Sequence, residues 1–433
     1  MSVTLVLDEN GISWYDIVKR SDDKIIYISA DGNDSWSGLS PVFISGNNGP
    51  KRNFQQGYNA LTGGTSDQLL CRRGDIFNIT SEVFINKSGR DPAQNGGILY
   101  PLLIGAYGTN EPGHTNADPR PILQATTNQT VLHMESSFPN GITNYVAIQS
   151  IHIKAATGSG IEIKQNGDWF LIEDCKVENA YQGITTYGDN ASSKPKFSRQ
   201  NFRRNVIFEC DGGHGQGFFI GNVGSGAFNL DHNIIVDCGY PDNLSHSIYC
   251  DNAIASGSIW TISKNIIFAK INTSEGIKSR QGGTIFDNFV LGSGIAYTMG
   301  SAPGDGSDNT VYDPIKLDFS YNTALDITNT GDGSIIDTLP DGNGGTYQET
   351  RLYQRGVGLY IMGIDYNSLP RNKIQYNLFK NNTGGDPYTI NFYSWNGSDR
   401  ILRNITIDSN VFYNMKGGFI FFCNQSFYSD IIL

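Results

Sequence analysis

Short runs of β-branched or aromatic residues recur along this chain, and each run follows a polar residue and an Asn. Apolar residues at helical spacing form no long stretch, so the pattern favours strands over helices. Each Asn is therefore predicted to stand at a turn, directly before a short strand. The positions are Asn205, Asn233, Asn265, Asn288, Asn322, Asn377 and Asn410, and Asp174 extends the series upstream.

The Asn positions are separated by distances that suit a repeat protein. Successive members lie 28, 32, 23, 34, 55 and 33 residues apart. Repeats of this length usually form one coil each of a solenoid, so the interval of 55 holds either two coils or one coil with an inserted loop. Because adjacent coils lie about 4.8 Å apart, each Asn amide can hydrogen-bond to the Asn above and below it. We expect a ladder of Asn side chains.

A second element lies between the ladder positions and consists of a small residue followed by a large apolar one. It occurs at Gly160-Ile161, Gly183-Ile184, Gly217-Phe218, Ser247-Ile248, Gly276-Ile277 and Gly294-Ile295. Two marked strands in each coil are what a parallel β-helix requires. The sequence therefore predicts an all-β protein, a right-handed parallel β-helix (solenoid) with an N-terminal cap and projecting loops.

On these repeats the chain resembles the pectate-lyase-like superfamily of right-handed parallel β-helices, which includes polysaccharide lyases, glycoside hydrolases, epimerases and bacteriophage tailspikes. The resemblance covers roughly residues 25–433 and includes IYISADGNDSWSGLSP, which is similar to the first strand of many such proteins. Residues 1–24 are expected to form a cap or an attachment segment. The last strand has no cap, so we expect either that the polypeptide continues or that another subunit covers that end. This fold hosts many chemistries, so the resemblance alone does not select one.

Composition and charge limit the classes of partner that the protein can bind. The 433 residues include 51 Gly, charged residues are 17%, and the net charge is −11. Nucleic acid is excluded as a partner because phosphate binding needs a surplus of Lys and Arg. We find no apolar run long enough for a membrane span and no secretory signal pattern in the given chain. Surface-acting β-helices without a signal are expected among virion proteins, which leave the host by lysis. We therefore expect an extracellular or virion-associated protein, and a homotrimer if it is a virion protein. The six cysteines are irregularly spaced and are interpreted as small buried residues, with Cys210 stacked on Cys238.

Alignment of the small–large elements predicts a polar patch on the outside of the solenoid. If Gly217, Ser247, Gly276 and Gly294 share a register, Phe218, Ile248, Ile277 and Ile295 point inward, and the outward stack is Phe219, Tyr249, Lys278 and Ala296. Tyr249 then lies beside Lys278 and Asp251 beside Arg280. At the entry turn, Gln216, His246, Glu275 and Ser293 are expected to lie one above another.

This patch has the groups that eliminative cleavage of a uronate glycan requires. A cation must bind the carboxylate, a base must remove the adjacent proton, and an acid must protonate the leaving oxygen. Arg280 suits the first role, Lys278 or His246 the second, and Tyr249 the third. We therefore predict a polysaccharide lyase with Lys278, Arg280, His246, Tyr249, Glu275 and Asp251 in its catalytic site, and with His214, Gln216, Tyr240 and Tyr297 contacting substrate.

Several alternatives remain open. The charged side chains can instead be surface ion pairs. A hydrolase would need two carboxylates, for which the candidates are Asp211, Asp242, Asp251 and Glu275. No cofactor is certain: His214 and His246 lack a zinc motif, whereas Asp31, Asn33 and Asp34, or Asp305 and Asp308, offer oxygen ligands for Ca²⁺. A bacteriophage tailspike or fibre domain that binds or hydrolyses a host surface glycan is the alternative function.

Overall fold

A computed structural model describes residues 2–7, 13–108, 119–135, 143–155, 157–164, 167–186, 197–210, 215–221, 227–239, 246–250, 259–269, 275–280, 282–300, 317–327, 334–340, 346–352, 357–362, 372–381, 388–393, 402–415, 418–422 and 428–432. The chain divides into two compact units. The first unit comprises Met1–Ile234 and Asn252–Thr261, and the second comprises Ile235–Asp251 and Ile262–Leu433. Each is described by itself.

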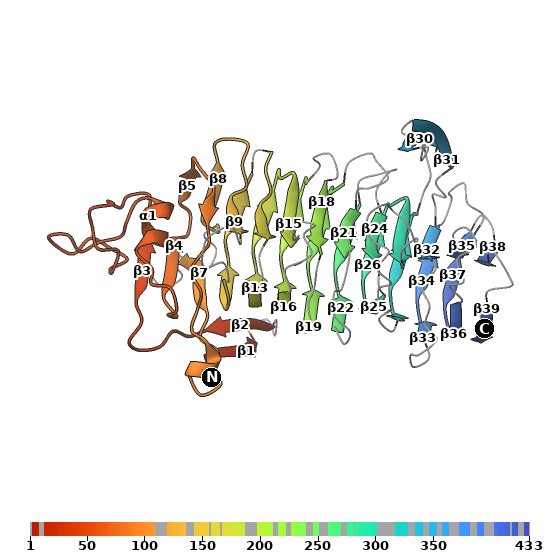
Figure 1. Ribbon diagram of the computed structural model, residues 1–433, viewed down its shortest axis with the longest axis horizontal. Coiled ribbons are helices and arrows are strands. Elements are labelled where there is room, and N and C mark those ends of the chain that lie inside the picture. Colours follow the sequence, from red (N-terminus) through yellow and green to blue (C-terminus); the bar gives the residue numbers. More distant parts are fainter. Residues whose placement is uncertain are drawn as a thin grey trace. The chain divides into compact units, whose positions relative to one another are not determined.

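In the first unit, parallel strands form three sheets, and from β4 to β18 each coil contributes one strand to each sheet (Figure 1). The first sheet is formed by β3 (Ile25–Ile28), β4 (Gln68–Arg72), β7 (Leu102–Tyr107), β10 (Val146–Gln149), β13 (Gly167–Glu173), β16 (Phe197–Arg203) and β19 (Ala227–Asp231). The second is formed by β5 (Ile76–Ile79), β8 (Ile122–Ala125), β11 (His152–Lys154), β14 (Lys176–Glu178) and β17 (Val206–Phe208). The third is formed by β6 (Val83–Phe84), β9 (Leu132–Glu135), β12 (Ile161–Lys164), β15 (Gln182–Thr186) and β18 (Gln216–Ile220).

The second unit repeats the arrangement. Its first sheet contains β25 (Gly283–Phe286), β28 (Leu317–Ser320), β33 (Asn372–Gln375), β36 (Leu402–Asp408) and β39 (Tyr428–Ile432). Its second contains β23 (Ile266–Phe268), β26 (Phe289–Leu291), β29 (Thr323–Leu325), β34 (Leu378–Lys380) and β37 (Val411–Tyr413). Its third contains β21 (His246–Cys250), β24 (Glu275–Ser279), β27 (Ile295–Met299), β32 (Val357–Met362), β35 (Tyr388–Tyr393) and β38 (Gly418–Phe422). Two further strands, β20 (Ile234–Val236) and β22 (Ile259–Ser263), contain residues of both units.

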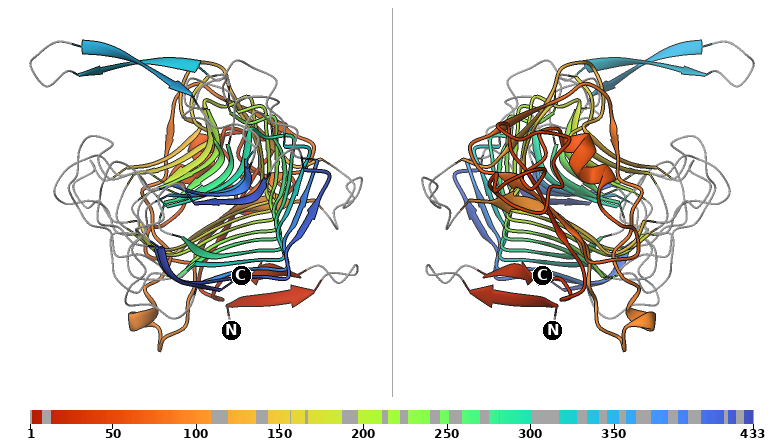
Figure 2. Two further views of the ribbon diagram at one scale, coloured as in Figure 1. Left: turned by 90° about the vertical axis from the view of Figure 1, so that its right-hand side faces the viewer. Right: turned by 90° about the vertical axis from the view of Figure 1, so that its left-hand side faces the viewer.

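These sheets confirm the predicted fold class, an all-β right-handed parallel β-helix. Within each unit, the strands of one sheet lie one behind another in the end-on views of Figure 2. Alternate residues of each strand point inward, as period-2 geometry requires, and stacked Ile, Leu, Val and Phe side chains fill the core. Burial of these apolar stacks stabilises each coil against the next.

The Asn ladder is present. In the first unit Asn205 donates to the Oδ1 of Asn233 from its backbone N and from its Nδ2, both at 3.0 Å. In the second unit the same paired bonds join Asn265 to Asn288, Asn288 to Asn322, Asn322 to Asn377, and Asn377 to Asn410. Because Asn322 contacts Asn377 directly, the 55-residue interval is one coil with an insertion. This insertion includes the antiparallel hairpin of β30 (Ser334–Pro340) and β31 (Thr346–Leu352).

One detail of the ladder differs from the prediction. Asp174 is not a ladder member: the backbone N of the following residue, Cys175, donates to Asn205 Oδ1 at 3.0 Å. The left-handed backbone angle belongs to the residue before each ladder Asn, as at Arg204 (φ 57), where the chain turns sharply. The five described cysteines form no disulfide and are buried, which agrees with their interpretation as small core residues.

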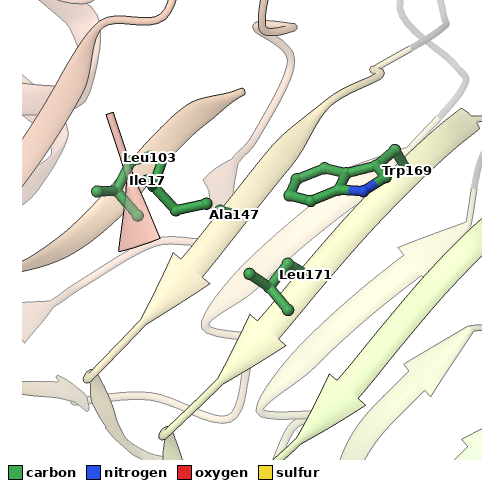
Figure 3. Close-up of a cluster of buried hydrophobic side chains, with 5 residues drawn as sticks. All are labelled: Ile17, Leu103, Ala147, Trp169 and Leu171. Carbon is green, nitrogen blue, oxygen red and sulfur yellow. The ribbon is translucent and has the colours of Figure 1, made fainter. Parts of the chain in front are cut away.

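An antiparallel hairpin precedes the β-helix and covers one flank of its first unit. It consists of β1 (Val3–Leu7) and β2 (Ser13–Ile17), and it lies beside the first sheet of its unit (Figure 1). Ile17 packs on the outward residues of that sheet, which are Leu103, Ala147, Trp169 and Leu171 (Figure 3). The backbone N of Tyr15 donates to the buried carboxylate of Glu173 at 2.9 Å. The hairpin thus buries apolar and charged groups that a bare sheet would expose.

The described chain contains a single α-helix, α1 (Phe54–Asn59). Asn53 caps it by accepting a hydrogen bond from the backbone N of Gln55. Phe54, Gly57 and Tyr58 are buried, and the Gly57 Cα approaches the side chains of Ile28 and Leu69 so closely that a Cβ would not fit. Helix α1 lies in the segment that lacks the repeat.

Candidate functional site

Strands β21 and β24 place the predicted residues next to each other on the third sheet of the second unit. Their register pairs His246 with Glu275 and Tyr249 with Lys278, as predicted. Ile248 and Ile277 pair between them and are fully buried in the interior. The outward face of the two strands therefore carries one imidazole, one phenol, one carboxylate and one ammonium group.

The third strand of this face has a different register from the predicted one. Ile277 pairs with Tyr297, and Lys278 pairs with Thr298, so the alignment of Ile277 with Ile295 and of Lys278 with Ala296 is wrong by two residues. Both Gly294-Ile295 and Ala296-Tyr297 match the small–large pattern, and the strand uses the second pair. A Cβ on Gly276 would lie 2.5 Å from the carbonyl oxygen of Ala296, which shows how close the two backbones come.

Tyr297 is consequently a core residue and not a substrate contact. Its side chain is fully buried, and its hydroxyl donates to the backbone oxygens of Asn288 or Thr323, at 3.0 and 2.9 Å. Burial raises the pKa of this phenol well above its usual value. The prediction that Tyr297 contacts substrate is therefore wrong. Alternation puts Tyr297 on the same inward face as Ile295, and a shift of two residues does not change the face.

His246 forms the floor of the cluster. It is 1% exposed, and its ring stacks on Tyr249 with 4.6 Å between centroids and 14° between planes. Its Nε2 lies 3.3 Å from Oε2 of Glu275. Burial lowers the pKa of His246, with a further lowering by Lys278 and Arg280, although Glu275 acts in the opposite direction. A buried imidazole of this kind is neutral near pH 7.

Glu275 is the one carboxylate among the described residues of this cluster. Burial by itself would raise its pKa, but Lys278 and His246 outweigh that effect and hold the pKa at about 2. Its Oε2 lies 3.9 Å from Nζ of Lys278. The carboxylate is therefore ionised, and it can orient Lys278 through charge.

Two cations lie against the ring of Tyr249. Nζ of Lys278 is 5.6 Å from the ring centroid, and Cζ of Arg280 is 5.4 Å from it. The backbone N of Arg280 donates to the carbonyl of Cys250 at 3.0 Å, which fixes the end of β24 beside the end of β21. Tyr249, Lys278 and Arg280 thus form a compact group with two positive charges around one phenol.

The other predicted site residues are placed as follows. Gln216 belongs to the first unit, is buried, and pairs with Gln182. His214, Tyr240 and Asp251 lie outside the described residues, as do Asp211 and Asp242. The predicted neighbourhood of Asp251 and Arg280 therefore stays a prediction.

Calcium ligation by the predicted loop residues finds no support. Asp31 forms an ion pair with Arg72 at 2.6 Å, and Oδ1 of Asp34 accepts from the backbone N of Arg52 and of Asn53. Within the described ranges, no three His, Cys, Asp or Glu side chains group as a metal site would require. Asp305 and Asp308 lie outside those ranges.

The sequence interpretation missed a second polar cluster, on the third sheet of the first unit. His133 of β9 lies between two carboxylates: its Nδ1 is 3.0 Å from Oε2 of Glu82, and its Nε2 is 3.6 Å from Oε2 of Glu162. Lys164 binds the other oxygen of Glu162 at 3.0 Å. The alternation of LHME and IEIK, with apolar residues inward, is the signal that would have paired His133 with Glu162.

No helix within the described part of the chain has the length and apolar character to cross a membrane.

Comparisons with known proteins give structural similarities only. No family model matches the chain, and no curated protein matches it. An alginate lyase from Paenibacillus sp. str. FPU-7 is similar in structure over 88% of this chain and 96% of its own, with 12% identity and a TM-score of 0.43. The catalytic domain of a GH87 alpha-1,3-glucanase in complex with nigerose is similar over 98% and 73%, with 13% identity and a TM-score of 0.47.

A PL6 family polysaccharide lyase from Pseudopedobacter saltans is similar over 85% of this chain and 91% of its own, with 13% identity and a TM-score of 0.33. With identities this low and TM-scores below 0.5, these similarities do not say which reaction this chain catalyses. The chain is similar to these proteins, and its membership of a family is not shown.

Proposed function

We propose that the chain is a polysaccharide-degrading enzyme that acts outside the cell that makes it, as an extracellular or virion-associated protein. Its reaction is β-elimination on a uronate-containing glycan. The observation that supports this function is the group of Tyr249, Lys278 and Arg280, in which two cations flank one phenol on adjacent strands. A site that binds a carboxylate and moves two protons needs these groups.

In the proposed reaction, Arg280 binds the substrate carboxylate and thereby acidifies the adjacent C–H. Lys278, as the uncharged amine, removes that proton and becomes the ammonium. The electron pair of the C–H bond forms a C=C double bond, the C–O bond to the leaving sugar breaks, and Tyr249 donates its proton to the leaving oxygen. No oxidant or other co-reactant is required.

His246 and Glu275 act as positioning residues in this proposal. His246 is almost completely buried beneath Tyr249, so it is poorly placed to touch a substrate. Glu275 lies 3.3 Å from Nε2 of His246 and 3.9 Å from Nζ of Lys278, and its charge holds the lysine. Of the two bases that the sequence suggested, the geometry therefore favours Lys278, whose side chain is 13% exposed.

The test is incubation of the full chain with polygalacturonate, alginate and a neutral glucan. We expect ultraviolet absorbance from the conjugated double bond with one of the uronate polymers and none with the glucan. Lys278→Ala and Arg280→Ala should each lower kcat/KM about 10²- to 10⁴-fold. Lys154→Ala, which changes a lysine on another sheet, is the control and should leave the rate unchanged.

Two results would contradict the proposal. If both site variants formed product at the normal rate, Lys278 and Arg280 would not be catalytic residues. New reducing ends without the absorbance, and products heavier by one water, would show hydrolysis, which needs a second carboxylate such as Asp251 beside Glu275.

A tailspike or fibre domain that binds or hydrolyses a surface glycan is the second candidate, with a homotrimer as its expected state. One observation supports contact between copies. On the second sheet of the second unit, exposed apolar residues lie on the two end strands: Ile266 and Phe268 of β23 are 39% and 40% exposed, and Val411 and Tyr413 of β37 are 55% and 60% exposed. Exposed apolar patches often mark protein–protein contacts. Light scattering of the wild type and of Val411→Lys tests it: a trimer that dissociates in the variant supports this candidate, and a monomeric wild type excludes it.

A further inference from the structure

A polar cavity lies in the first unit, close to helix α1. Its volume is about 560 Å³, which falls within the range of small-molecule sites. Three parts of the chain form its wall. They are helix α1, strand β6 with the residues on either side of it, and one residue between β8 and β9. The lining residues are Gln55, Tyr58, Asn59, Ser81, Glu82, Phe84, Asn86 and Gln129.

The wall is held in place by hydrogen bonds. The buried hydroxyl of Tyr58 accepts from the backbone N of Asn86 at 2.8 Å, which ties α1 to the segment after β6. Nε2 of Gln55 donates to Oδ1 of Asn59 at 2.9 Å, and Nε2 of Gln129 donates to the carbonyl of Ile79 at 3.1 Å. Because these side chains are already ordered, a ligand would bind them at a small entropic cost.

His133 supports two of the lining residues from behind. Its Nδ1 lies 3.0 Å from Oε2 of Glu82, and its ring stacks on Phe84 with 5.3 Å between centroids and 27° between planes. The imidazole is 6% exposed, and Glu162 faces its other nitrogen at 3.6 Å. The carboxylate and the aromatic ring are therefore fixed relative to each other.

The lining chemistry suits an uncharged, hydroxyl-rich ligand. Each amide carries two N–H donors and an oxygen with two lone pairs, and the bonds described above use only part of this capacity. Phe84 offers an apolar ring for the C–H surface of a sugar. The lining contains no Lys or Arg, whereas Glu82 contributes a carboxylate that repels anions.

We propose that this cavity binds a neutral sugar unit, in pyranose form, of a glycan. Phe84 contacts the C–H face of the ring, and Gln55, Asn59, Asn86 and Glu82 hydrogen-bond to its hydroxyl groups. The site is built from residues of the first unit and does not rest on the proposed elimination at Lys278 and Arg280. A chain with both sites would bind neutral units of a glycan in addition to the uronate that it cleaves.

Saturation-transfer difference NMR on the full chain tests the proposal. The probes are the methyl glycosides of glucose, galactose, mannose and N-acetylglucosamine, together with methyl glucuronide. We expect transfer to the ring C–H protons of at least one neutral glycoside and weaker transfer to the glucuronide.

The variants identify the site. Asn59 is exposed, so Asn59→Ala should fold normally and should weaken binding roughly tenfold, as expected for the loss of hydrogen bonds in a binding site. Phe84→Leu should reduce transfer to the ring protons. Gln56→Ala changes an exposed neighbour on α1 that does not line the cavity, and it should bind like the wild type.

Absence of transfer to every neutral glycoside would overturn the proposal, as would stronger transfer to the glucuronide. So would unchanged binding by the Asn59 and Phe84 variants. Lyase activity is measured on the same variants, and its loss or retention bears only on the separate catalytic proposal.

Discussion

Each ladder Asn satisfies several buried backbone groups at once. Oδ1 of Asn288 accepts from the backbone N and the Nδ2 of Asn265, while its own Nδ2 lies within hydrogen-bond distance of the carbonyl of Ile262 at 2.9 Å and of Asn322 Oδ1 at 3.0 Å. A residue of similar size without an amide cannot replace these bonds. The ladder is therefore a structural requirement of the corner.

Asn288→Ala should destabilise the protein by about 2–3 kcal/mol, because the substitution leaves buried donors and acceptors without partners. Urea unfolding followed by circular dichroism measures the change. Asn414→Ala, at an exposed corner where Nδ2 donates to Asn381, should cost less than about 0.5 kcal/mol. Equal losses for the two variants would show that burial of the ladder adds nothing.

The candidate site also gives the stability a dependence on pH. The folded-state pKa values of His246 and Glu275 both lie below their ordinary values of 6.5 and 4.5, that of Glu275 at about 2. The unfolded chain then binds more protons than the folded chain as the pH falls. Their contribution to stability is present above pH 6.5, decreases below that value for His246, and decreases again between 4.5 and about 2 for Glu275.

Urea unfolding at a series of pH values between 8 and 3 checks this expectation. The free energy of unfolding should fall with decreasing pH in both ranges. Glu275→Gln should flatten the lower range, and His246→Asn the upper one. A wild-type profile that does not change between pH 7 and 5 would show that His246 is not held neutral.

Among the elements, the β1–β2 hairpin covers a face of the first sheet that would otherwise be exposed to solvent. Ile17 covers Leu103, Ala147 and Leu171, and Gln149 joins Glu173 to the hairpin by donating to the carbonyl of Tyr15 at 2.8 Å. Glu173 lies 3.4 Å from Arg203, so a buried ion pair is sealed beneath the strand. Removal of the cover would expose apolar side chains and hydrate this pair.

Ile17→Ala should therefore cost about 2 kcal/mol or more in unfolding free energy, as for other buried aliphatic side chains. Thermal unfolding or urea unfolding measures it. Leu7→Ala changes a residue of the same hairpin that is 70% exposed, and it should have almost no effect. A stable Ile17 variant would show that the hairpin packs only loosely on the sheet.

For the molecule as a whole, the net charge of −11 opposes the approach of a polyanionic substrate, although two cations lie in the candidate site. Long-range repulsion is screened by salt more strongly than contacts within a partly buried site. The charge of the whole chain and the charge of the site therefore act in opposite directions.

We expect kcat/KM for a uronate polymer to rise a few-fold as ionic strength increases from about 10 mM to 100 mM, because repulsion is screened over this range. Initial rates at low substrate concentration measure the effect. A short uronate oligomer carries fewer charges and should respond less. A steep fall with salt would indicate that local attraction dominates, in contradiction to this expectation.

The sequence by itself determined the coil. A fixed position for Asn before a short strand sets the corner, and alignment of the small–large elements paired His246 with Glu275 and Tyr249 with Lys278. Local pattern suffices there because each rung contacts mainly its neighbours. Two registers satisfy the same pattern at Ile295 and Tyr297. The packing of Tyr297 on Phe319 and the close approach of Gly276 to the Ala296 backbone decided between them.

Tertiary structure also decided which residues that are far apart in the sequence come into contact. Gln55 of α1 and Gln129 line the same cavity, and Tyr15 of the hairpin hydrogen-bonds to Glu173. The sequence separation of neither pair follows from the repeat. Such contacts depend on how non-repeating segments fold back on the solenoid, which is governed by shape and burial rather than by periodicity.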